Sequence, residues 1–218
     1  MTGLAMALAV ARRDLVIEAS GRHLSGVVGP FAVAGVLLAG LAFGPVPSVF
    51  DAVAPGLPWL VVLLLASPLS RTVAEVEQHD GCWDLLRGLV GPAALLWGKL
   101  AVTWLWLAGT WTLTAALTIV VLDAELAAAA LPAAVLGTLG LAGAVVVYGT
   151  AAATGGSGSG GGGLLAALIL PAGLPALLAG TQAGMPGVDP GPWLALLGAY
   201  DLAGLAVAWA VYPTLLEE

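Results

Sequence analysis

Charged side chains are scarce in this chain of 218 residues. Lys, Arg, Asp and Glu make up 9% of it and hydrophobic residues make up 60%. A typical soluble domain is about a quarter charged, so this composition excludes a protein whose whole surface faces water. The mean hydropathy of +1.04 agrees. We expect an all-α integral membrane protein, because the uncharged stretches are long enough to cross a bilayer core, which takes about 20 residues of helix.

Residues that carry redox, metal or nucleotide chemistry are also few. Cys82 is the single cysteine, so no internal disulfide can form, and the chain has no zinc or haem-attachment pattern. His23 and His79 lie outside the hydrophobic stretches, which gives little support for an intramembrane hydrolase. The chain lacks a Gly-x-x-x-x-Gly-Lys-Ser/Thr loop and cannot be its own P-loop ATPase. We expect no metal, no tightly bound cofactor and no nucleic-acid partner.

The uncharged stretches predict six transmembrane helices in one domain that covers residues 1–218. The stretch 126–188 is too long for one helix, and a Gly/Ser run at 154–163 divides it into two. The Pro- and Gly-rich loop after the first span is expected to turn among lipid headgroups. Trp59 and Trp193 are expected at the outer interface. We place the spans near residues 25–45, 57–74, 94–121, 127–152, 164–183 and 192–212.

The positions of the basic residues predict the orientation. With six spans all six lie on one side of the membrane, which the positive-inside rule makes cytoplasmic. Both ends of the chain are then cytoplasmic, in a bacterial inner membrane. The opposite loops carry acidic residues, which contribute little to orientation. The basic residues are Arg12, Arg13, Arg22, Arg71, Arg87 and Lys99, and the acids opposite are Asp51, Asp123, Glu125 and Asp189.

Residues 1–23 predict an amphipathic helix that lies on the cytoplasmic membrane surface. Leu4, Leu8 and Leu15 recur at helical spacing, and the charged residues occupy other faces. Glu18 and Arg22 are four residues apart, which supports a helix. A plain solvated tail is the alternative.

The main cytoplasmic element is the segment from Arg71 to Lys99, with three of the six basic residues and four of the thirteen acids. A short amphipathic helix is plausible after the Asp80–Gly81 turn. Pro92 would end it before the third span.

Two features within the spans have competing interpretations. Asp201 is the single intramembrane carboxylate and is a functional candidate, because burying such a group is costly. It is equally well explained by a hydrogen bond to Tyr200, Thr or Ser neighbours, or by access to an aqueous gap. Trp97, Trp104 and Trp111 are spaced by seven along the third span. Their indoles could stack on a planar ligand such as haem, although packing between spans or against lipid is the more ordinary explanation.

Several residues resemble a known family. The run APGLPWLVVLLLASPLSR at 54–71, followed by Asp80–Gly81, Pro92 and Lys99, is similar to the cytochrome c maturation membrane subunit CcmB, or haem exporter protein B. The stretch GGLLAALILPAGLPALLAG at 162–180 resembles its fifth span. The loop between spans 4 and 5 departs from the family: it is often basic there, but residues 155–163 are only Gly and Ser, from either natural divergence or editing.

This resemblance implies a permease of the ABC-2 type that dimerises in the membrane and works with a separate ATP-binding subunit. A haem-handling membrane subunit would be a further partner, and haem would be a handled ligand in c-type cytochrome biogenesis. A permease for a lipid or drug is an alternative, as is a membrane scaffold or enzyme that uses Asp201. The resemblance places ATPase coupling at residues 75–91, with the candidate residues Glu75, Glu77, Asp80, Gly81, Asp84, Leu85, Leu86 and Arg87.

Overall fold

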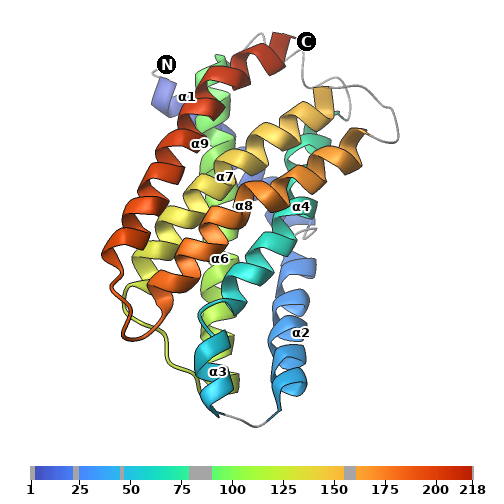
Figure 1. Cartoon of the computed structure of the whole chain (residues 1–218). Coiled ribbons are helices and arrows are strands. Elements are labelled where there is room, and N and C mark those ends of the chain that lie inside the picture. Colours follow the sequence, from blue (N-terminus) through green and yellow to red (C-terminus); the bar gives the residue numbers. More distant parts are fainter. Residues whose placement is uncertain (1–2, 22–24, 45–46, 79–89, 155–160, 218) are drawn as a thin grey trace.

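The computed structural model describes residues 3–21, 25–44, 47–78, 90–154 and 161–217. These residues form helices and contain no strand, which confirms the all-α class. The helices, labelled as in Figure 1, are α1 (Gly3–Gly21), α2 (Ser25–Phe43), α3 (Pro47–Val53), α4 (Leu57–Gln78), α6 (Pro92–Leu122), α7 (Ala130–Thr154), α8 (Gly161–Gly184) and α9 (Gly191–Glu217).

Helices α2, α4, α6, α7, α8 and α9 run alternately up and down the bundle (Figure 1). The ends of α4, α7 and α9 and the starts of α1, α6 and α8 lie at one end of the bundle (Figure 1). Helix α7 is central, because it contacts α4, α6, α8 and α9. Helix α2 packs at the edge, against α6 and α4.

Among the described residues, four helices are long and apolar enough to cross a bilayer: α6, and the stretches Ala130–Ala152, Ala167–Gly184 and Gly191–Leu216. Helices α2 and α4 contain shorter apolar stretches, Val28–Phe43 and Leu57–Ser70. The chain is therefore a helical protein of multi-pass membrane type. A helix lies at each of the six ranges where the sequence predicts a span.

Four boundaries differ from the sequence-based expectation. Helix α9 continues to Glu217, five residues beyond the expected end of the sixth span. Helix α4 continues to Gln78, four residues beyond the expected end of the second span. Helix α8 begins at Gly161, within the run expected to be a Gly/Ser loop. The expected turn after the first span contains the short helix α3, which starts at Pro47. Proline is tolerated in the first helical turn because its missing N–H has no intrahelical partner there.

Several threonine hydroxyls on α6 are satisfied within the helix. The hydroxyls of Thr110, Thr114 and Thr118 each donate to the carbonyl four residues earlier on α6, at 2.7–2.8 Å. This back-bonding gives a buried hydroxyl a partner where water is excluded. Helix α6 ends at Asp123, whose φ of 52° places it in the left-handed region that stops the helical hydrogen-bond ladder.

Helix α1 confirms the helical part of the N-terminal prediction, and its contacts add a feature that the sequence pattern did not suggest. Ala7 and Val10 are buried where α1 packs against α6. Gly98 makes this approach possible, because a Cβ there would lie 2.8 Å from the Cβ of Val10. The leucine face points away from the bundle, with Leu4 74% exposed. This face is free to contact lipid.

Candidate functional site

The expected coupling segment, residues 75–91, connects α4 to α6. Glu75 and Glu77 lie in the last turns of α4, so the segment begins as a continuation of that helix. Helix α6 begins at Pro92, after Gly91 in an extended conformation. The remaining candidates, Asp80, Gly81, Asp84, Leu85, Leu86 and Arg87, fall outside the described residues.

The two helices that flank this segment contact each other in the core. Trp59 of α4 and Trp111 of α6 make an edge-to-face contact, with ring centroids 6.1 Å apart and planes inclined by 60°. Leu63 and Leu69 of α4 belong to the same buried cluster, together with Leu107 of α6. A displacement at the ends of α4 and α6 would therefore reach the centre of the bundle through packed side chains.

Trp59 occupies the centre of the packing, which corrects the expectation that it lies at the outer interface. Its side chain is 2% exposed. Gly137 of α7 and Gly180 of α8 make room for its ring, since a Cβ at Gly137 would lie 2.5 Å from a ring carbon and a Cβ at Gly180 would overlap the ring. The hydropathy pattern could not reveal this position, because an interfacial and a buried indole look alike in sequence. The signal in the sequence that could have indicated a buried ring was the presence of glycines, such as Gly137 and Gly180, in two later spans.

Asp201 is buried between α9 and α7, with 4% of its surface exposed. Gly140 makes room for it, because a Cβ there would lie 2.5 Å from Oδ1. The backbone of Gly140 is the polar group that faces the carboxyl group, although neither oxygen has a hydrogen-bond partner among the described residues.

The suggested hydrogen bond from Tyr200 to Asp201 is wrong. The Tyr200 hydroxyl donates instead to the carbonyl of Ala172 on α8, at 3.0 Å. The low exposure of Asp201 also argues against direct contact with an aqueous gap. A functional role for this carboxyl group stays a prediction.

The three tryptophans spaced by seven on α6 lie in different environments. Trp111 is buried against Trp59. Trp104 is partly buried and donates from Nε1 to the carbonyl of Val135 on α7, at 3.2 Å. Trp97 is 48% exposed. Trp104 and Trp111 thus have the interhelical contacts that the packing interpretation describes, and stacking on haem stays a prediction.

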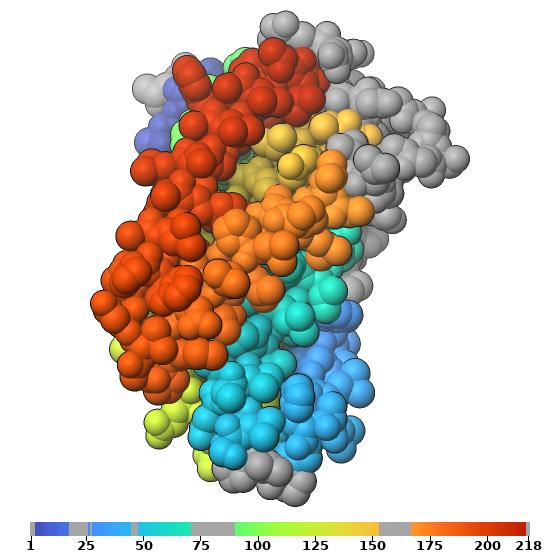
Figure 2. Space-filling model, viewed as in Figure 1, coloured from blue at the N-terminus to red at the C-terminus, as the bar shows by residue number. Residues whose placement is uncertain are grey.

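Lys99 and an apolar groove are two features that the sequence pattern did not single out. Lys99 lies two turns into α6 and is buried, although it was expected among the cytoplasmic charges. The groove, of about 650 Å³, opens between α2, α4 and α8 and is lined by side chains such as Phe31, Leu38, Leu60 and Leu177. Figure 2 looks onto the face where these three helices lie next to one another.

Among the described residues, no group of three or more His, Cys, Asp or Glu side chains is close enough together to hold a metal ion. The family model described as CcmB protein matches residues 5–217, which is nearly the whole chain. No curated protein matches it.

Proposed function

The chain belongs to the CcmB protein family, and on that premise we propose that it is the permease subunit of an ABC transporter for haem handling in c-type cytochrome biogenesis. Membership implies a membrane component of the haem-export ABC system that serves cytochrome c maturation, working with partner subunits. The match over residues 5–217 is the observation that carries the proposal. ATP hydrolysis would take place on a separate ATP-binding subunit, and a haem-handling membrane subunit would complete the complex.

In the proposed topology, α2, α4, α6, α7, α8 and α9 cross a bacterial inner membrane and both chain ends are cytoplasmic. The distribution of charge supports this orientation. The starts of α1 and α6 lie at one end of the bundle (Figure 1); Lys99 belongs to the first half of α6, and Arg12 and Arg13 lie midway along α1. Asp51 on α3 and Asp189 before α9 lie towards the other end of the bundle. Lys and Arg near span ends favour the cytoplasmic side.

Energy coupling would use residues 75–91 as the docking surface for the ATPase. The helical extension of α4 through Glu75 and Glu77 supports this role, because a rigid helix end transmits a displacement directly. Closure of the ATPase would move α4 and α6 together, since Trp59 and Trp111 join them in the core. The haem molecule is a handled ligand in this proposal.

A second copy of the chain is the proposed partner within the membrane. The groove between α2, α4 and α8 supports this assembly, because it presents apolar side chains over about 650 Å³ on one face. Two copies that meet through this face would bring both coupling segments to the same side of the membrane. Such a dimer would match a pair of ATP-binding subunits.

Co-purification with the ATP-binding subunit tests the docking surface. We expect E75K, D80K and D84K together to abolish association, because they reverse the charge of the docking segment. The matched control is D189K, which reverses an exposed acid at the opposite end of the bundle. Unchanged association of the triple variant, or equal loss with D189K, would remove the docking proposal.

The substrate assignment has a separate test. Deletion of the gene should eliminate mature c-type cytochromes, measured by their haem absorbance, and the wild-type gene should restore them. Normal cytochrome levels in the deletion strain would favour a permease for another substrate, such as a lipid or drug. The docking result would stand in that case, because it reports the ATPase contact alone.

A further inference from the structure

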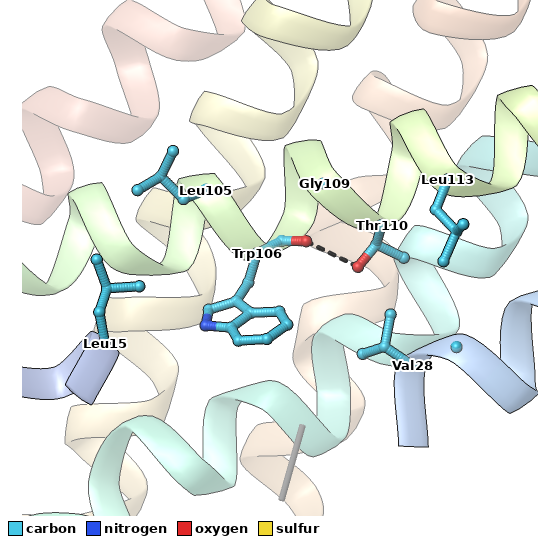
Figure 3. Close-up of a pocket in the computed structure, with 8 residues that line it drawn as sticks. Leu15, Val28, Leu105, Trp106, Gly109, Thr110 and Leu113 are labelled. Carbon is cyan, nitrogen blue, oxygen red and sulfur yellow. Dashed lines mark hydrogen bonds between the residues drawn. The ribbon is translucent and has the colours of Figure 1, made fainter. Parts of the chain in front are cut away.

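A cavity of about 380 Å³ lies where α1, α2 and α6 meet. Its volume falls within the range of about 300–1,000 Å³ that is common for small-molecule sites. Figure 3 shows Leu15 of α1, Val28 of α2 and Leu105, Trp106 and Leu113 of α6 around it. The coupling segment and Asp201 do not line this cavity, so the function proposed above does not use it.

The wall of the cavity is suited to hydrocarbon. Four of its side chains are aliphatic, and the ring of Trp106 adds an apolar aromatic surface. The Thr110 hydroxyl already donates to the Trp106 carbonyl at 2.7 Å, the dashed line in Figure 3. The Trp106 Nε1 atom is buried and has no hydrogen-bond partner among the described residues. A polar ligand would lose its hydration here for few new hydrogen bonds, whereas an alkyl chain has no hydrogen bonds to lose.

Charged residues lie at the end of the cavity nearer the start of α6. Arg12 is exposed and lies three residues before Leu15, on the same face of α1. This corrects the expectation that the charged residues occupy other faces than the leucines. Arg12 forms no ion pair within the described part of the chain, in contrast to Arg13, which pairs with Asp14 at 3.1 Å. A cationic group above an apolar cavity matches the order of phosphate and acyl chain in a phospholipid.

We propose that this cavity holds an acyl chain of an anionic phospholipid from the leaflet in which α1 lies, with the lipid phosphate beside Arg12. The exposed leucine face of α1 places this junction against lipid, with Leu8 63% exposed. The bound lipid fills the space that α1 and α2 leave against α6. This inference depends on insertion in a membrane and is independent of haem.

Two glycines in the cavity wall allow a direct test. A Cβ at Gly29 or Gly109 would meet no atom within 4 Å. A leucine at either position can therefore extend into the cavity, because its Cβ does not collide with a neighbouring residue. Gly198 on α9 has the same open surroundings and does not line the cavity, which makes G198L a matched control. Retained lipid is counted by native mass spectrometry of the purified chain, after addition of dioleoyl phosphatidylglycerol or dioleoyl phosphatidylcholine.

We expect the wild-type chain and G198L to retain one phosphatidylglycerol in preference to phosphatidylcholine. G109L and G29L should each bind it about tenfold more weakly, a loss of about 1.4 kcal/mol, because the leucine takes space that the acyl chain would occupy. R12Q should lose the preference for phosphatidylglycerol while its binding of phosphatidylcholine is unchanged. Because the two filling variants lie on different helices, failure of one to fold leaves the other as the test.

Three results would overturn the proposal. The first is a wild-type chain that retains no phosphatidylglycerol. The second is equal retention by G109L, G29L and the wild type, which would place the lipid elsewhere. The third is a dimer that contains no lipid and that both G109L and G29L disrupt. In that case a second copy of the chain, and not a lipid, would occupy the cavity. A preference that survives R12Q would overturn the assignment of the phosphate to Arg12.

Discussion

Replacing Gly180 by alanine tests how tightly the Trp59 ring is packed between α7 and α8. A Cβ at residue 180 would overlap the indole ring. The ring cannot move aside, because Gly137 of α7 lies against it and Trp111 contacts it at a centroid distance of 6.1 Å. The added methyl group must therefore push α8 away from α4, or force Trp59 out of its rotamer.

The expected loss of unfolding free energy is about 1–3 kcal/mol, the usual range for overpacking. The rigidity of the ring favours the upper half of this range. G198A is the control, and it should be neutral or stabilising by up to about 1 kcal/mol, because alanine has the higher helix propensity and no atom obstructs it. In a W59L background the ring is absent, so G180A should cost less than about 0.5 kcal/mol, within the scatter of independent sites.

The measurement is unfolding by SDS in mixed micelles, followed by circular dichroism for the four members of the double-mutant cycle. A coupling energy of at least about 1 kcal/mol is expected between positions 59 and 180. Equal destabilisation by G180A in both backgrounds would refute the reasoning, because the obstruction would then not be the indole. The W59L substitution will itself lower the free energy of unfolding. The loss should be smaller than in a water-soluble protein, because an indole that leaves the bundle core of a membrane protein enters lipid, which is also apolar.

Two further substitutions test the other close contacts. G98V should release α1 from α6, because a Cβ at residue 98 would already lie 2.8 Å from the Cβ of Val10; trypsin should then cleave at Arg12 and Arg13 faster than in the wild type and in G198V, and equal rates would contradict the contact. D201N should retain the wild-type unfolding free energy within about 1 kcal/mol, because neither carboxylate oxygen has a hydrogen-bond partner among the described residues. It should also retain mature c-type cytochromes, and their loss at a normal protein level would show that Asp201 acts through its charge.

The sequence predicted the helices more accurately than it predicted their contacts. Uncharged stretches of sufficient length marked α6 and α7 to within about three residues and the start of α9 to within one, whereas α9 continues to Glu217, beyond its expected end at 212. Boundaries were missed where local composition misled: Gly161 is helical despite the low helix propensity of glycine, and α4 continues beyond its expected end at 74 through the charged Glu75 and Glu77. Backbone hydrogen bonding continues a helix through residues that do not favour one, when the helix is already formed on one side of them.

The candidate site was predicted unevenly. Asp201 was found because a single carboxylate within an apolar stretch is conspicuous in sequence, but its partner was wrong, since Tyr200 faces α8 instead. Trp59 was placed at an interface because indoles favour that depth. Its burial depends on Gly137 and Gly180, which are far away in sequence and belong to two other helices.

The sequence by itself determined that the chain is helical, apolar and of multi-pass membrane type, and that it resembles the family whose model matches it. These properties are sums over short stretches of chain, because span length, hydropathy and charge placement need no knowledge of neighbouring helices. The tertiary structure decided which face of α1 meets α6, where the indole of Trp59 lies, and which backbone faces Asp201. Those outcomes depend on the fit of side chains between helices, where one missing Cβ decides which group can enter.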